Sequence, residues 1–315
     1  MEREIGGYLE LERNTGTLLH EGALALNSGR AALAYLIEQR EIRAMALPRF
    51  VCDVVRDVCL AHGVELRLYG TDLRLSPPDV EPKEGEWLYV VNWYGRMGQE
   101  TLSALAAQCP RLIVDDAQAY FAPPVPGADT LYTCRKFLGV PDGAFLYTDA
   151  PARELERDVS YGRMGFVLGR LELGASAFYR EASANNDSLS AEPLRMSRLT
   201  EDLLRGIDYD RVRRRREANY AVLAAALDGV GALPPACPPG PYAYPFLTED
   251  GPALRRKLIE HKIYVPQLWP NVVREEPAGS PERLLAENIL PLPCDQRYGE
   301  EDMKYLLEVL EACMH

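Results

Sequence analysis

Short apolar segments alternate with helix-forming segments between residues 30 and 147, and this alternation constrains the fold most strongly. Strands are expected at 45–47, 64–69, 87–91, 112–114, 130–133 and 144–147, and helices at 30–40, 51–62 and 101–108. Most of the strand segments are continuous apolar runs, which is typical of strands that are buried on both faces. The alternation therefore predicts an α/β fold, with a mostly parallel sheet between helices.

The second half of the chain has a different pattern. A long helix is expected over 198–228 with a break near Gly206, and a proline-rich connection follows at 234–241. Beyond it we expect strands at 242–247, 263–265 and 289–292, a helix at 252–261 and a terminal helix from about residue 300. Because 315 residues exceed what one hydrophobic core usually serves, the sequence predicts two domains. They are a large domain at 15–200 and a small α+β domain at 201–315, with residues 1–14 packed on either.

Charge and cysteine usage exclude several classes of protein. The formal net charge of −12 repels phosphate polyanions, so we expect no nucleic-acid partner. The sequence has no apolar signal region and no apolar run long enough to span a membrane, so we expect a cytoplasmic protein. Seven scattered cysteines without a C-x-x-C pair favour a reducing compartment and no metal site.

Ser28, Gly29, Arg30 and Ala31 stand at the start of the first expected helix. The free N–H groups and positive dipole end of a helix form a phosphate cradle, and glycine lets the backbone approach a ligand closely. Taken alone, a glycine turn before a helix is more often ordinary capping.

Asp115 and Gln118 follow the apolar strand at 112–114. A carboxylate at this position can keep a heterocyclic nitrogen protonated, and the amide can hydrogen-bond a ring hydroxyl. Two polar residues in a surface turn are the plainer interpretation of the same pattern.

Lys136 lies between aromatic and apolar residues in the segment Tyr132–Gly143. Burial among such neighbours lowers the pKa of a lysine and frees its amine to form a Schiff base. An ordinary solvated lysine is the alternative.

A phosphate cradle, a carboxylate for a ring nitrogen and an imine-forming lysine, in this order, are the parts of a pyridoxal phosphate site. With these parts in place, residues 27–147 resemble the large domain of the DegT/DnrJ/StrS-type nucleotide-sugar aminotransferases. The family's phosphate-binding stretch G-[ST]-x-A-L corresponds to Gly29–Leu33, and its E-D-x-x-[QH] strand end corresponds to Val114–Gln118. The segments His261–Val265 and Leu290–Pro293 resemble the family's small domain.

The resemblance implies a role for each candidate residue. Lys136 and Asp115 are the catalytic pair, in which Lys136 carries the internal aldimine and moves the substrate proton while Asp115 binds the pyridinium nitrogen. The expected cofactor-binding set consists of Ser28, Gly29, Arg30, Ala31, Phe50, Asn92, Asp115, Gln118, Thr133 and Lys136. Phe50 is expected to stack on the ring. The implied reaction moves an amino group from an amino acid such as glutamate to a nucleotide-linked keto-sugar, in a homodimer.

The sequence also departs from the family pattern. Arg30 replaces the usual Ser or Thr, Cys52 falls where the family has an aromatic, and the Ser-Phe-His run before the lysine is missing. Two alternatives therefore stay open: another type of pyridoxal phosphate reaction on a sugar, and a binding or regulatory protein with little turnover.

Two further segments have alternative interpretations. Residues 185–187 (Asn-Asn-Asp) either reach a cofactor phosphate across a dimer interface, as an asparagine does in the family, or form a plain loop. The four arginines at 213–216 are interpreted as a solvated or subunit-facing helix surface, because a helix spreads them around its circumference.

Overall fold

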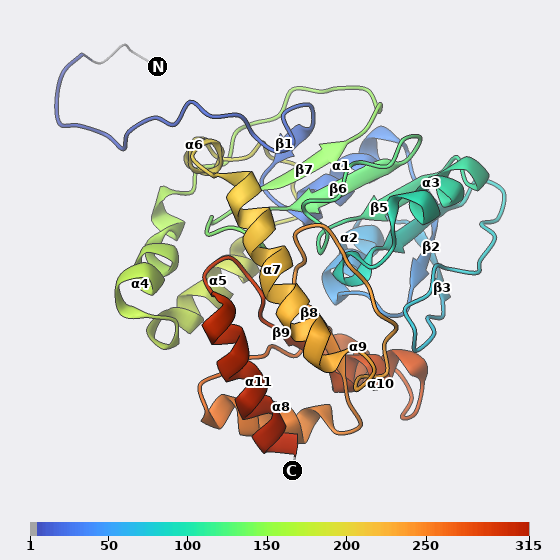
Figure 1. The fold of residues 1–315 in the computed structure, drawn as a ribbon. Coiled ribbons are helices and arrows are strands. Elements are labelled where there is room, and N and C mark those ends of the chain that lie inside the picture. The colour runs from blue at the N-terminus through green and yellow to red at the C-terminus, as the bar shows by residue number, and fades with distance from the viewer. Residues whose placement is uncertain (1–4, 315) are drawn as a thin grey trace.

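A seven-stranded sheet forms the centre of the molecule in the computed structural model, which describes residues 5–314 (Figure 1). Its strands lie in the order β1-β7-β6-β5-β4-β2-β3. Their bounds are β1 (Leu24–Leu26), β2 (Ala44–Pro48), β3 (Glu65–Tyr69), β4 (Trp87–Val91), β5 (Leu112–Asp115), β6 (Asp129–Thr133) and β7 (Ala144–Tyr147). The pairs β2–β3, β2–β4, β4–β5 and β5–β6 are parallel, whereas β7 runs antiparallel to both β6 and β1. The predicted α/β fold with a mostly parallel sheet is confirmed.

Helices cover both faces of this sheet. On one face α1 (Gly29–Gln39) packs against β6 and β7, and α2 (Asp53–Ala61) packs against α1 and β3. The crossover from β4 contains the short 3₁₀ helix η1 (Trp93–Gly95) and then α3 (Gln99–Gln108). On the other face Leu204 and Val212 join a buried cluster with Tyr132 and Phe145 of β6 and β7. These two residues come from α6 (Arg198–Arg205) and α7 (Tyr209–Leu227).

The C-terminal part of the chain forms a smaller layer below the sheet in Figure 1. It contains β8 (Tyr244–Leu247) paired antiparallel with β9 (Ile289–Leu292), and the helices α8 (Gly251–Glu260), α9 (Pro270–Glu275), α10 (Pro281–Asn288) and α11 (Glu300–Met314). A separate apolar cluster joins α7, α8, β8, β9 and α11. The domain boundary at 200/201 stays a prediction, because other C-terminal residues such as Val272 and Leu285 belong to the core of the large sheet.

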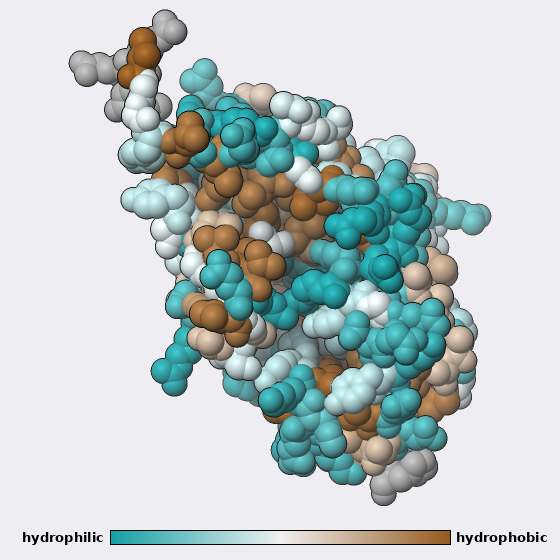
Figure 2. All heavy atoms as spheres, turned by 60° about the vertical axis from the view of Figure 1, so that its left-hand side comes forward, coloured by the Kyte–Doolittle hydropathy of each residue, from teal (hydrophilic) through white to brown (hydrophobic). Residues whose placement is uncertain are grey.

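The helices α4 (Gly165–Leu173) and α5 (Tyr179–Ser188) lie to the side of the sheet and expose much apolar surface. Brown, hydrophobic side chains gather on this side of the molecule in Figure 2. The exposed residues in this region are Val159, Tyr161, Leu168, Leu171, Leu173 and Tyr179.

Residues 5–13 extend away from the body of the molecule (Figure 1). Residues 5–13 are exposed, including Tyr8 and Leu9, and Asn14 attaches the arm to the body through hydrogen bonds to Asp202. The first four of the residues predicted to pack on either domain lie outside the described part. Within residues 5–314 no helix combines the length and the apolar character that a membrane span requires.

Two local predictions from the sequence are wrong and one is confirmed. The expected strand at 263–265 is wrong, because Ile263 to Val265 follow Lys262, which has φ 61°, and run as irregular chain beside the β8–β9 pair. The break in the 198–228 helix is confirmed, since Gly206 separates α6 from α7. The solvated-surface interpretation of residues 213–216 is wrong for Arg216, whose side chain is fully buried.

Candidate active site

The carboxyl ends of β1, β4, β5 and β6 meet at one edge of the sheet. Leu26 of β1 and Thr133 of β6 lie at the same level of the sheet, because both pair with Ala144 of β7. On the other side, Val91 of β4 pairs with Asp115 of β5. The segments that follow these strands therefore lie together at one edge of the sheet.

The start of α1 forms one end of the site. The Ser28 hydroxyl caps the helix by accepting a hydrogen bond from the Ala31 N–H at 3.1 Å. Thr133 packs directly against the first turn, since a Cβ added to Gly29 would come within 2.9 Å of its methyl group. The Thr133 hydroxyl donates to the Ala117 carbonyl at 3.2 Å. The start of α1 and Thr133 thus form a corner in which only a glycine fits at position 29.

Asp115 ends β5 and is held from two sides. Its Oδ2 accepts a hydrogen bond from the Tyr89 hydroxyl at 2.8 Å, and its Oδ1 accepts from the Ala117 N–H at 2.9 Å. Each carboxylate oxygen can accept more than one hydrogen bond, so the fixed group retains acceptor capacity.

Lys136 lies in the turn between β6 and β7, facing the same site as Asp115. Its side chain is open to solvent, yet the protein atoms around the amine are numerous enough for desolvation to lower its pKa. The negative charge of Asp115 acts in the opposite direction and raises the pKa. The amine is therefore accessible to a ligand from one side and crowded by protein on the others. Desolvation thus shifts the amine towards its neutral, nucleophilic form.

The turn that carries Lys136 is fastened to the C-terminal layer. The Phe137 carbonyl accepts hydrogen bonds from Arg216 Nη2 at 3.0 Å and from Gln296 Nε2 at 2.8 Å. The Arg216 guanidinium lies over the Phe137 ring at 4.7 Å, and the Tyr242 ring lies 6.0 Å from Lys136 Nζ. The sequence prediction missed Tyr242, Arg216 and Gln296, since only the tertiary fold brings them to the lysine.

Gln118 and Asn92 occupy buried positions beside Asp115. Gln118 Oε1 accepts a hydrogen bond from the Tyr94 N–H at 2.8 Å, and its Nε2 has no protein acceptor in the part of the chain described. Asn92 donates to Asp116 Oδ1 and accepts from the Met97 N–H, both at 2.9 Å. This geometry gives Asn92 a structural role, and its contact with a cofactor stays a prediction.

Asp116 is fully buried behind Asp115. Burial raises its pKa to about 7, and the charge of Asp115 adds to the effect. Its Oδ2 has no hydrogen-bond partner. The sequence does not show which of the two adjacent aspartates is buried, so the raised pKa of Asp116 could not be predicted from it.

Aromatic residues line the side of the site towards the C-terminal layer. Phe50 is fully buried, with its ring 4.3 Å from that of Trp269 and 5.6 Å from that of Trp93. Phe50 therefore presents no free face in this conformation, and its stacking on a cofactor ring stays a prediction. Cys52 is half-buried near Lys136, and burial raises the pKa of its thiol.

Two aromatic residues in this region have left-handed backbone conformations. Trp269 has φ 52° and Tyr94 has φ 56°, which is unfavourable for residues with bulky side chains. Their rings meet edge to face at 6.2 Å. Such strain is concentrated at functional sites, and here it holds aromatic rings near the lysine turn.

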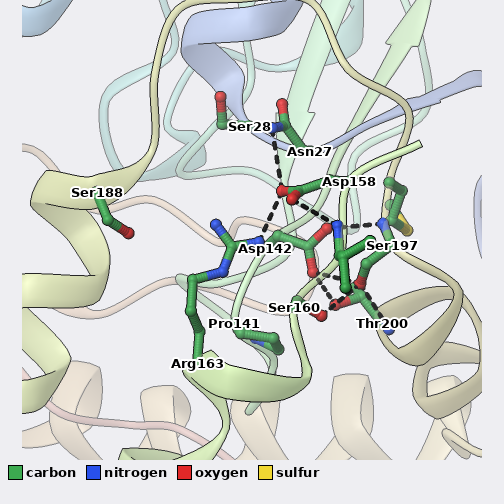
Figure 3. Close-up of polar contacts among 12 residues, drawn as sticks. Asn27, Ser28, Pro141, Asp142, Asp158, Ser160, Arg163, Ser188, Ser197 and Thr200 are labelled. Carbon is green, nitrogen blue, oxygen red and sulfur yellow. Dashed lines mark hydrogen bonds and ion pairs between the residues drawn. The ribbon is translucent and has the colours of Figure 1, made fainter. Parts of the chain in front are cut away.

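A polar network stabilises the backbone behind the α1 start (Figure 3). Asp142 accepts hydrogen bonds from the Ser197 N–H and hydroxyl, both at 2.8 Å, and from the Thr200 hydroxyl. Asp158 accepts from Asn27 Nδ2 at 3.2 Å and pairs with Arg163 at 2.7 Å. The network ties the segment before Ser28 to α6 and to the chain before α4.

Several solved structures share the fold of this chain. DesV from S. venezuelae, in complex with a ketimine intermediate, has a TM-score of 0.64 and 19% identity over 93% of this chain and 85% of that one. A DegT DnrJ EryC1 StrS aminotransferase from Brucella abortus has a TM-score of 0.62 and 16% identity, covering 92% and 86%. The PLP-form of a sugar aminotransferase, Spr1654 from Streptococcus pneumoniae, has a TM-score of 0.61 and 13% identity, again covering 92% and 86%.

The predicted fold is therefore confirmed over nearly the whole chain. No family model matches the sequence, and no curated protein sequence matches it.

Proposed function

We propose that this protein is a pyridoxal phosphate-dependent aminotransferase acting on a sugar. The observation that carries the proposal is the arrangement of Lys136, Asp115 and the α1 start at one edge of the sheet. The residues present suit the cofactor, because the corner between Gly29 and Thr133 has room only without a Cβ, and the Lys136 amine is desolvated yet accessible. The use of this cofactor by structural neighbours supports the same assignment.

The cofactor, when bound, supplies an aldehyde for the lysine amine and an aromatic ring that withdraws electrons from the reacting carbon. Asp115 would bind the ring nitrogen and keep a proton on it, because its carboxylate is fixed by Tyr89 and Ala117. Gln118 has a free amide N–H to donate to the ring hydroxyl.

Lys136 would both react with the cofactor and transfer a proton at its Nζ. A lowered pKa leaves a larger fraction of the amine unprotonated near neutral pH, which a base and nucleophile needs. The contacts of Phe137 with Arg216 and Gln296 would hold the turn during this transfer. The Tyr242 ring limits access of water from the side of the C-terminal layer.

The amino donor and the acceptor follow from the resemblance noted in the sequence. We infer that an amino acid such as glutamate donates the amino group and that a nucleotide-linked keto-sugar accepts it. The exposed apolar residues of α4 and its surroundings support a homodimer, since a soluble monomer rarely exposes so many large apolar side chains together.

The test is borohydride reduction of the protein incubated with pyridoxal phosphate, followed by peptide mass spectrometry. A reduced pyridoxyl group on Lys136 is expected, with no adduct in Lys136→Ala and an unchanged adduct in the exposed control Lys83→Ala. Loss of the cofactor absorbance band on addition of glutamate would then support transamination. A band that persists with every amino donor would favour a binding protein, and an adduct on another lysine would refute the assignment.

A further inference from the structure

Two arginines flank the α1 start and share one partner. Arg30, in the first turn of α1, donates through Nη1 to the backbone carbonyl of Asn186 at 2.7 Å and to that of Leu189. Arg135, directly before Lys136, donates through Nη1 and Nη2 to the Asn186 side-chain oxygen at 3.4 and 3.3 Å. The C-terminal end of α5 is therefore held against the α1 start by two guanidinium groups of the same chain.

Neither arginine has a carboxylate partner within residues 5–314. Arg30 and Arg135 form no salt bridge, and the acid nearest to Arg135 in electrostatic effect, Asp142, already accepts hydrogen bonds from Ser197 and Thr200. Burial lowers the pKa of Arg135 to about 10, and the positive charges of Arg30 and Arg163 lower it further. Arg163 itself has one charge partner, Asp158 (Figure 3).

This excess of positive charge lies where the α1 dipole also points its positive end. Carbonyl and amide oxygens stabilise a guanidinium less than an anion does, because hydrogen bonds between two charged groups are about twice as strong. The described chain thus brings together two guanidinium groups and free helix N–H groups, and no carboxylate forms an ion pair with either arginine. Such a group of donors is suited to a phosphate dianion.

We propose that the Arg30 and Arg135 side chains bind the phosphate group of the cofactor, and that Asn186 competes with this phosphate for Arg135. The inference rests on the proposed function, and it assigns the phosphate to two guanidinium groups of this chain in addition to the backbone N–H groups. Phosphate binding would draw Arg135 away from Asn186 and loosen the end of α5. The opposite expectation, in which Asn186 is itself a phosphate ligand, predicts the opposite effect of removing its side chain.

The test compares the dissociation constants of pyridoxal phosphate and pyridoxal, measured by absorbance titration. The dissociation constant of pyridoxal divided by that of pyridoxal phosphate gives the contribution of the phosphate group, called here the phosphate advantage. The two ligands share the ring and the aldehyde, so only the phosphate differs between them. We expect Arg30→Gln and Arg135→Gln each to lower the phosphate advantage about tenfold or more, the range for a charge-assisted hydrogen bond. Arg135→Lys should retain part of it, and the exposed control Arg180→Gln on α5 should leave it unchanged.

Asn186→Ala separates the two expectations. Competition predicts a phosphate advantage that is larger by roughly threefold, the effect of one modest hydrogen bond. A reduced advantage in Asn186→Ala, or an unchanged advantage in both arginine variants, overturns the proposal.

A second measurement distinguishes this inference from the proposed function. Inorganic phosphate should raise the midpoint of thermal unfolding of the wild-type protein and have a smaller effect on Arg30→Gln and Arg135→Gln. If no adduct forms on Lys136 but this difference is present, the proposed function fails and the phosphate site stands. If inorganic phosphate affects wild type and variants equally, the phosphate site is refuted even where the Lys136 adduct forms.

Discussion

Replacement of Arg216 by methionine tests how firmly the lysine turn depends on the C-terminal layer. Arg216 is 1% exposed, and its guanidinium donates to Gln296 Oε1 at 2.7 Å, to the Pro241 carbonyl at 2.9 Å and to the Phe137 carbonyl at 3.0 Å. Burial lowers its pKa, which reflects the cost of enclosing the charge. Methionine keeps most of the apolar volume and removes every one of these donors.

The magnitude follows from these contacts. A hydrogen bond to a charged group contributes about 1.5–3 kcal/mol, but the variant also avoids the cost of burying the guanidinium. The Phe137 carbonyl keeps its bond from Gln296, whereas the Pro241 carbonyl is left without a strong donor. We therefore expect Arg216→Met to lower the free energy of unfolding by about 2–4 kcal/mol.

Urea unfolding followed by circular dichroism measures this difference. Arg214→Ala is the matched control, because Arg214 lies on the same helix with an exposed side chain and should change stability by less than about 0.5 kcal/mol. A loss below about 1 kcal/mol in Arg216→Met would mean that the Phe137 turn does not depend on this arginine. Pyridoxal phosphate affinity should fall in the same variant, because the turn positions Lys136.

Four other outcomes follow from the structure. Burial lowers the pKa of His20 to about 4, so stability should fall by up to about 3 kcal/mol as pH decreases from 6.5 to 4, and an equally steep fall in His20→Phe would contradict this. The raised pKa of Asp116 makes stability fall as pH rises towards 7, so Asp116→Asn should stabilise the protein by about 1–4 kcal/mol at pH 8 in urea unfolding. Gly29→Ala should weaken pyridoxal phosphate binding about tenfold, and adding Thr133→Ser, which removes the crowding methyl group, should restore it; failure of the rescue would show that the clash is not the cause. Leu171→Asp on α4 should dissociate a homodimer in analytical ultracentrifugation, and an unchanged mass would place the interface elsewhere.

The fold was largely predictable because buried parallel strands and their crossover helices have strong local patterns. All six strands expected between residues 45 and 147 are present, with bounds that differ by at most one residue. The candidate residues on strand ends were predictable for the same reason, since parallel strands bring their carboxyl ends to one edge. The positions of Asp115 and Lys136 after strands follow from this rule, whereas Thr133 is expected only from the family resemblance.

The features that the sequence does not predict depend on contacts between segments that are distant in the chain. A helix places four consecutive arginines around its axis, and the sequence pattern does not show which of them faces the protein. The sequence therefore places Arg216 on the surface, although its side chain is buried. The pairing of Arg30 and Arg135 with Asn186 joins three positions that are far apart in the chain. The strand expected at 263–265 is absent because Lys262 has a left-handed backbone conformation, and Ile263 and Val265 fill the core as irregular chain.

Because Ala144 pairs with both Leu26 and Thr133, this one residue of β7 sets the distance between the two sides of the corner formed by the α1 start and Thr133. Lengthening the 138–142 loop would leave this distance unchanged, because the loop lies before the paired segment, which begins with the backbone hydrogen bonds of Gly143 to Cys134 and Asn27. One extra residue inserted within β7 next to Ala144 would instead shift one neighbour relative to the other by a whole pleat. Tolerance of insertions should therefore change abruptly between two adjacent positions of this hairpin.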